Sequence, residues 1–243
     1  MNESTLVSVH GYAGDRHQIE MLEIVYRHHG CPIVICSPVD SKIEGLCSDY
    51  HYLFAGLRAY TGRLSWERQY LQMKKLLTFD ADWFLLNDSD SFCFTPQLPS
   101  YLYEDENVVW GSKVNDFRKP GETWTDKNGS ITWPDNYHQG HELVALQPSY
   151  FMHRKAMTKL VDAYPLMQDD PITPFIDWQM QYLPDLAGVP TKSFHHFVSC
   201  ETETEMGLRL VASKVREGAT FIHAVKRPEA FHVLCEAYWS TLK

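Results

Sequence analysis

The sequence predicts an α/β fold, in which a central, mainly parallel sheet is flanked by helices within a single domain. The first 95 residues alternate short apolar runs with amphipathic stretches, the pattern of strands joined by right-handed helical crossovers. The chain has 243 residues, of which 44% are hydrophobic and 22% charged. That length and composition are typical of a globular protein with a large core.

Each expected element follows from its local pattern. Short apolar runs bounded by Gly, Pro or Asp indicate buried strands, and apolar residues at helical spacing indicate helices. The expected strands cover residues 6–9, 32–36, 83–86, 108–110 and 221–226. The expected helices cover residues 19–30, 64–77, 153–163, 177–186 and 201–217. Residues 115–141 are rich in Gly, Pro, Asn and Asp, so we expect a long loop there, which in a compact domain is usually functional or mobile.

Charge and hydropathy exclude several classes of protein. The 22 Lys and Arg against 31 Asp and Glu give a net charge of −9, which argues against broad electrostatic capture of nucleic acid. No apolar run reaches the roughly 18 residues of a membrane span, and the first residues lack a basic and apolar leader. The six cysteines show no C-x-x-C or zinc spacing. We therefore expect a reduced, cytoplasmic protein without a membrane span.

The strongest chemical signal is the acidic pair in Asp88-Ser89-Asp90, directly after the apolar run at 83–86. In open α/β sheets, ligands bind beyond the carboxyl ends of the strands. Two carboxylates at that place can hold a hard divalent cation such as Mg²⁺ or Mn²⁺, which shares its oxygen ligands with substrate phosphates. The alternative is a polar turn after a strand, because D-x-D also occurs by chance.

The segment from Trp83 to Asp90 resembles the D-x-D strand of glycosyltransferases with the GT-A fold, a Rossmann-like fold, which use nucleotide-sugar donors. The resemblance implies a hexosyl- or pentosyltransferase with a nucleotide-diphosphate sugar as donor, expected to be a UDP-sugar, and Mn²⁺ or Mg²⁺ as cofactor. It also implies that Asp88 and Ser89 contact the donor and that Asp88 and Asp90 bind the metal.

The same resemblance assigns the rest of the donor site. The helix at 64–77 would meet the donor through Arg68 and Gln72, although many relatives carry Arg or Lys at the position of Gln72. The expected contacts to the nucleoside, in the loops after the first two strands, are His10, Gly11, Tyr12, Asp15 and Asp40. Residues 1–95 would form the nucleotide-sugar-binding lobe of the single domain 1–243. Residues 96–243 would form the acceptor lobe and the C-terminal metal and phosphate segment.

A late segment, His223-Ala224-Val225-Lys226, is similar to the H-x-x-K segment of glycogenin-like retaining members. By that similarity His223 completes the metal site, and Lys226 contacts the diphosphate of the donor and stabilises the departing group. A neutral imidazole and an ammonium are chemically suited to these two roles. The alternative is a buried histidine in a strand followed by a solvated lysine.

Asp177 is the candidate acidic residue near the acceptor, and with Lys226 it makes up the expected catalytic pair. The resemblance places it at the start of a helix, where inverting members carry the general base. An aspartate there is also a good helix cap, and the two interpretations are compatible. The late His223 and Lys226 favour retention of the anomeric configuration, and retention is our expectation.

Two other functions fit parts of the sequence. A sugar nucleotidyltransferase has a similar fold, but residues 10–16 match its Gly-rich basic loop poorly. A non-catalytic nucleotide- or sugar-binding module would not need Asp177 or Lys226. The acceptor stays open between a hydroxylated base in phage DNA, a glycan, a protein and a small molecule. For a viral chain, the cytoplasm would be that of the host.

Overall fold

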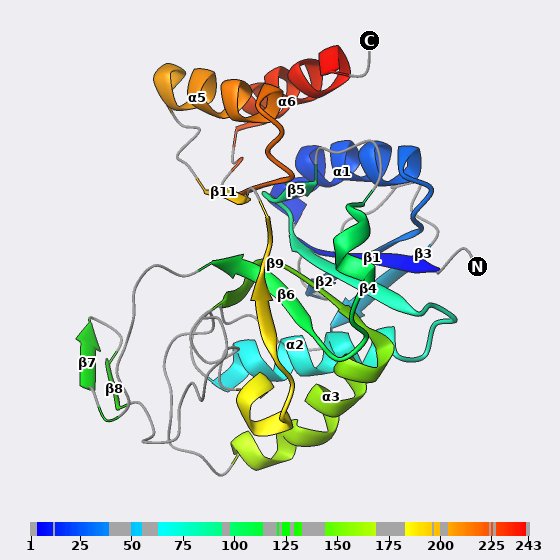
Figure 1. The fold of residues 1–243 in the computed structure, drawn as a ribbon, viewed down its shortest axis with the longest axis vertical. Coiled ribbons are helices and arrows are strands. Elements are labelled where there is room, and N and C mark those ends of the chain that lie inside the picture. Colours follow the sequence, from blue (N-terminus) through cyan, green and yellow to red (C-terminus); the bar gives the residue numbers. More distant parts are fainter. Residues whose placement is uncertain are drawn as a thin grey trace.

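The computed structural model describes residues 4–11, 13–38, 50–54, 63–93, 98–113, 121, 123–126, 129–132, 144–168, 183–195, 197–199, 204–223, 225 and 227–241. In these ranges the main sheet has seven strands in the order β10-β6-β9-β4-β1-β2-β3 (Figure 1). The strands are β1 (Thr5–His10), β2 (Ile33–Pro38), β3 (Tyr50–Phe54), β4 (Trp83–Asp88), β6 (Val109–Lys113), β9 (Val144–His153) and β10 (Thr191–Ser193). All neighbours are parallel except β9, which is antiparallel to β4 and β6. The predicted α/β fold with a mainly parallel sheet is confirmed.

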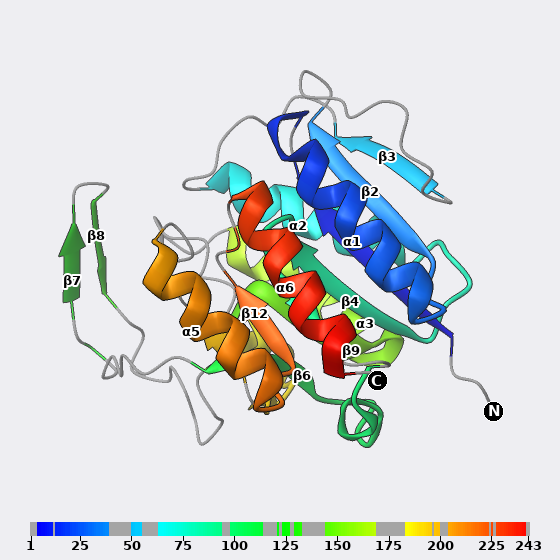
Figure 2. The same cartoon turned by 90° about the horizontal axis from the view of Figure 1, so that it is seen from above.

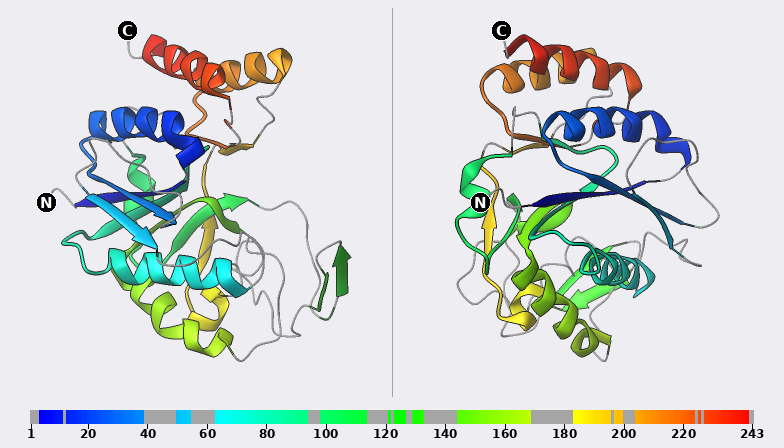
Figure 3. Two further views of the ribbon diagram at one scale, coloured as in Figure 1. Left: turned by 180° about the vertical axis from the view of Figure 1, so that it is seen from behind. Right: turned by 90° about the vertical axis from the view of Figure 1, so that its right-hand side faces the viewer.

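Helices cover both faces of this sheet, as the views in Figures 1 and 3 show. On one face lie α1 (Arg16–His28), α5 (Glu205–Arg216) and α6 (Pro228–Thr241), and on the other lie α2 (Arg63–Leu76) and α3 (Arg154–Gln168). The side chains of β1 alternate between the two cores: Val7 and Val9 belong to the core beside α1, and Leu6 to the core beside α2 and α3. In the described part of the chain, no helix combines the length and the apolar character that crossing a membrane requires.

A second, three-stranded sheet joins the late part of the chain to the end of β4. It consists of β5 (Phe92–Cys93), β11 (Phe197–Ser199) and β12 (Phe221–His223) in the order β11-β12-β5. Because β5 begins only four residues after β4 ends, its pairing with β12 brings the late segment to the carboxyl edge of the main sheet. Seen from above, α5 and α6 lie side by side over β12, with α1 next to α6 (Figure 2).

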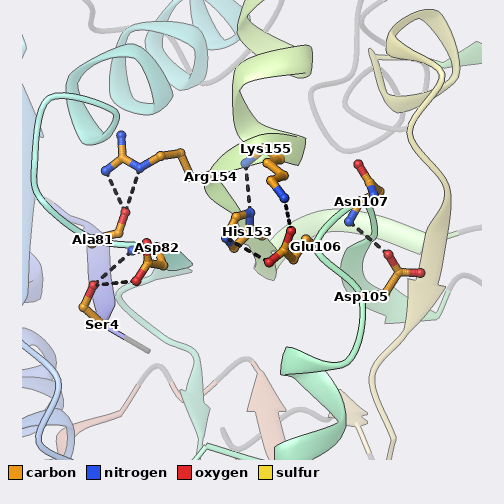
Figure 4. A network of polar contacts seen from close by, with 9 residues as sticks. All are labelled: Ser4, Ala81, Asp82, Asp105, Glu106, Asn107, His153, Arg154 and Lys155. Atoms are coloured by element: carbon orange, nitrogen blue, oxygen red, sulfur yellow. Dashed lines mark hydrogen bonds and ion pairs between the residues drawn. The ribbon is translucent and has the colours of Figure 1, made fainter. Parts of the chain in front are cut away.

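Arg154, the first residue of α3, lies at the other end of the strands, where its N–H donates to the carbonyl of Asp82 just before β4 (Figure 4). The guanidinium of Arg154 donates hydrogen bonds to the backbone carbonyls of Leu77 (2.8 Å), Ala81 (2.9 and 2.6 Å) and Phe79. These carbonyls follow the end of α2, where helical partners are no longer available. A cation at a helix C-terminus also interacts favourably with the helix dipole. Arg154 therefore connects α3 to the end of α2.

Several elements differ from the sequence expectation. The expected loop over 115–141 contains a hairpin of β7 (Thr123–Asp126) and β8 (Gly129–Thr132), in which Trp124 is the backbone pairing partner of Ile131. Strand β9 was not expected, because Pro148 interrupts its apolar pattern. Pro148 lies where the pairing of β9 with β6 is irregular, between the pairs Gly111–Tyr150 and Ser112–Ala145. A missing N–H there removes no regular ladder bond, so the strand tolerates the proline.

The C-terminal region also departs from the expectation. The late strand ends at His223, earlier than the expected residue 226, and α6 follows it unexpectedly, with Pro228 in the first helical turn, where proline is favoured. Of the expected helix at 177–186, only residues from 183 onwards are described, and residues 183–187 are helical. The described ranges also contain two short 3₁₀ helices, η1 (Ala13–Asp15) and η3 (Ser100–Tyr103).

Candidate functional site

The candidate site lies at the carboxyl edge of the main sheet, where β1 and β4 end side by side. The two strands are parallel and in register, so that His10 pairs with Asp88 at their last positions. Beyond β4 the chain makes a tight turn, in which the N–H of Ser91 donates to the carbonyl of Asp88 at 3.2 Å. This is the edge at which open α/β sheets bind their ligands. The turn carries the acidic pair that the sequence singles out.

Asp90 and the late histidine face each other at this turn. Asp90 Oδ1 lies 3.7 Å from His223 Nε2, and both side chains are partly buried, with exposed fractions of 19% and 28%. The backbone holds the same two segments together, because the N–H of Val225 donates to the carbonyl of Asp90 at 3.1 Å. The structure therefore brings together two of the three expected metal ligands from distant parts of the sequence.

Asp88, the third expected ligand, lies at a small cavity on the α2 side of the strand ends. The cavity has a volume of about 10 Å³, about the size that holds one water molecule. Its lining consists of His10, Gln69, Gln72, Leu86, Asn87, Asp88, Pro148 and Tyr150. Within the described residues, no group of three or more His, Cys, Asp and Glu side chains is arranged to hold a metal ion. The ligand set of Asp88, Asp90 and His223 stays a prediction.

Buried polar groups surround this cavity. Gln72 is 3% exposed, and its Nε2 donates to Ser8 Oγ at 2.6 Å. Gln69 Oε1 and Asn87 Oδ1 are buried and have no hydrogen-bond partner within the described part of the chain. Buried polar atoms of this kind are usually satisfied by a water or a ligand. The described lining contains no Lys or Arg, and the side chain of Arg68, the expected basic contact from α2, lies outside the described residues.

The loop after β1 meets the acidic turn from the other side. Ser89 Oγ donates to Asp15 Oδ2 at 3.0 Å, which brings together two residues that the resemblance assigns to the donor site. Asp15 precedes α1 as its N-cap, but its side chain makes no capping hydrogen bond there. At Gly11, an added Cβ would lie 2.4 Å from Ile19 Cδ1 and 3.4 Å from Ser89 Cβ. A side chain at this position would therefore have to displace the end of the Ile19 side chain in α1, whereas glycine fits without any shift.

Some of the expected residues lie outside the described part of the chain. They are Tyr12, Asp40, Asp177, Lys226 and the side chain of Arg68. The sequence analysis missed Gln69, Asn87 and Tyr150, which line the cavity beside the expected residues. The available signal was the spacing of Gln69 and Gln72, which places two amides on one buried helical face next to Met73.

Comparisons with known proteins agree with this architecture. No family model matches the chain, and no curated protein matches its sequence. The structure is similar to that of a glycosyltransferase involved in the glycosylation of the major capsid of PBCV-1, with a TM-score of 0.54 and 13% sequence identity. The match covers 95% of this chain and 98% of the other. The chain therefore has the fold of a glycosyltransferase over almost its whole length.

Proposed function

We propose that the protein is a metal-dependent glycosyltransferase that moves a sugar from a nucleotide-diphosphate sugar, foremost a UDP-sugar, to an acceptor hydroxyl. The observation that carries the proposal is the pair of Asp90 and His223, whose Oδ1 and Nε2 atoms lie 3.7 Å apart at the carboxyl end of β4. This pair lies at the ligand-binding edge of a sheet in a chain with a glycosyltransferase fold.

The chemistry of the pair fits a divalent cation. Asp90 offers a carboxylate oxygen and His223 an imidazole nitrogen, a mixed set that suits Mn²⁺ better than Mg²⁺, which takes oxygen ligands. Both side chains are partly exposed, so that positions on the ion would stay open for phosphate oxygens. A cation bound there would neutralise the negative charge that develops on the departing diphosphate.

The other donor contacts are assigned by position. Asp88 and His10 lie together at the strand ends, and Asp15 reaches the turn through Ser89. We assign His10 and Asp15 to the nucleoside, and Asp88 to the donor and, with Asp90 and His223, to the metal. We assign Lys226 to the diphosphate, because the backbone of its neighbour Val225 is bound to the turn. A fixed ammonium at that place would stabilise the leaving group.

The stereochemistry and the acceptor complete the proposal. With Lys226 and the cation on the leaving group, the departing phosphate oxygen can take the acceptor proton, and we propose retention. Asp177 would be the general base if the reaction inverted instead. The role of the similar structure in capsid glycosylation favours a glycan or glycoprotein acceptor for this chain too. The net charge of −9 disfavours DNA.

The test is a screen of nucleotide sugars for cleavage in the presence of Mn²⁺ or EDTA, with and without candidate acceptors. We expect one donor to be cleaved only with the metal, and Asp90→Asn to lower the rate at least about 100-fold. The matched control is Asp105→Asn, because Asp105 is a partly exposed carboxylate that pairs with Lys192 at 3.9 Å away from the turn. Full activity in EDTA, or equal activity of the two variants, would contradict the proposal.

A further inference from the structure

The acidic turn is supported from inside the core by one phenol of α1. Tyr26 is fully buried, and its Oη accepts a hydrogen bond from Asn87 Nδ2 at 2.5 Å. The backbone of Cys93 is hydrogen-bonded to the same phenol. Asn87 immediately precedes Asp88, and Cys93 comes three residues after Asp90. One oxygen atom therefore contacts the chain on both sides of the turn.

The contact with Cys93 also reaches the segment that carries the histidine. Cys93 in β5 pairs with Phe221 in β12, and β12 ends at His223. Asp90 is thus connected to Tyr26 through Asn87, and His223 is connected to it through Cys93. The positions of Asp90 and His223 therefore both depend on contacts with the same buried phenol.

The residues that flank α1 make further contacts with this region, and these are more exposed to water. Asp15 bonds Ser89 at 3.0 Å, and His29 Nε2 lies 3.3 Å from the carbonyl of Cys93, both in partly buried surroundings. Asn87, in contrast, is 3% exposed. Loss of the phenol oxygen would leave Asn87 Nδ2 buried without this hydrogen bond. A buried donor without a partner costs free energy, so the Asn87 side chain would move toward another partner.

We propose that Tyr26 is a positioning residue, which fixes the turn of Asp88 to Asp90 relative to His223 for the binding of the metal and donor. What the turn binds rests on the proposed function, whereas the fixing of the turn does not. Because Tyr26 is fully buried, it would act on the bound metal and donor through the turn and not by touching them. Burial raises its pKa well above the usual value, so the phenol stays protonated at neutral pH.

The test compares Tyr26→Phe with Tyr103→Phe. Both substitutions remove only a hydroxyl, and the Oη of Tyr103 bonds Thr5 Oγ1 at 2.9 Å near the other end of β1. Amide hydrogen exchange of residues 87–93 is measured without ligand, and Mn²⁺ affinity is measured by electron paramagnetic resonance in the presence of UDP. For Tyr26→Phe we expect roughly tenfold faster exchange in this segment and roughly tenfold weaker Mn²⁺ binding, and neither change for Tyr103→Phe.

Unchanged exchange in Tyr26→Phe would overturn the proposal, as would faster exchange with unchanged Mn²⁺ affinity, which would make the phenol merely structural. If Tyr26→Phe failed to fold, Asn87→Ala removes the same hydrogen bond from the strand side and is measured in its place. If the unaltered protein bound neither Mn²⁺ nor UDP, the proposed function would fail. The exchange comparison would then still decide whether Tyr26 fixes the turn.

Discussion

Replacing Arg154 with methionine should destabilise the fold strongly, although the residue lies far from the candidate site. The guanidinium donates to three backbone carbonyls after the end of α2 and lies over the ring of Phe84, with 5.5 Å between its central carbon and the ring centroid. Methionine keeps much of the packing and removes every donor. A hydrogen bond with a charged partner contributes about 1.5–3 kcal/mol.

The site is only partly buried, so water can replace some of these bonds, and we expect a loss of about 3 kcal/mol in the free energy of unfolding for the three carbonyls together. For a chain of this length, that corresponds to a fall in Tm of roughly 6–12 °C. Urea titration followed by tryptophan fluorescence measures the loss.

The matched control is Lys155→Met, the next residue in the same helix. Lys155 pairs with Glu106, but its side chain is 62% exposed, so the pair contributes little to stability. If Arg154→Met cost no more than Lys155→Met, the guanidinium would not connect α3 to α2 as inferred from the structure.

Two further predictions concern the loop after β1 and the acid limb of stability. Gly11→Ala should cost about 1–3 kcal/mol because its Cβ would meet Ile19 Cδ1. Combined with Ile19→Val, which removes that atom, the loss measured by chemical denaturation should be smaller than the sum of the two single losses, and strict additivity would refute the contact. The hydrogen bond from Lys155 holds the pKa of Glu106 below its usual value of 4.5. The ionised carboxylate therefore contributes to the free energy of unfolding above that value, and this contribution is lost as pH falls through the folded-state pKa. Glu106→Gln should therefore flatten the acid limb of the stability curve below about pH 4.5, and an unchanged slope would contradict the assignment.

The sequence predicted the central parallel strands β1, β2 and β4 because they are buried on both sides, but it did not predict β3 and β10 at the two edges of the sheet. Trp83, Phe84, Leu85 and Leu86 are each at most 1% exposed, and strands buried in this way appear as continuous apolar runs. Strand β9 gave no such signal, because Pro148 and Ser149 interrupt it and an irregular register with β6 accommodates them. Long-range pairing of this kind cannot be derived from local pattern.

The candidate site, too, could be predicted from the sequence only in part. The resemblance of the D-x-D strand and of the late His-x-x-Lys segment to glycosyltransferases led us to expect that Asp90 and His223 lie together, and the structure places them 3.7 Å apart. The sequence could not show that Asp88 lies at the cavity with Gln69, because that placement depends on which face each residue of the strand end presents. Nor could it show the role of Tyr26, since a buried tyrosine in an amphipathic helix resembles ordinary core packing.

The measurement that tests the central claim most directly is a Mn²⁺ titration of nucleotide-sugar cleavage after removal of all metal with EDTA, for the unaltered protein and for His223→Gln. We predict no cleavage without metal, saturable recovery as Mn²⁺ is added, and a half-saturating Mn²⁺ concentration at least about tenfold higher for His223→Gln. Cleavage that persists in EDTA, or titration curves that coincide for the two proteins, would contradict a metal-dependent glycosyltransferase built on Asp90 and His223.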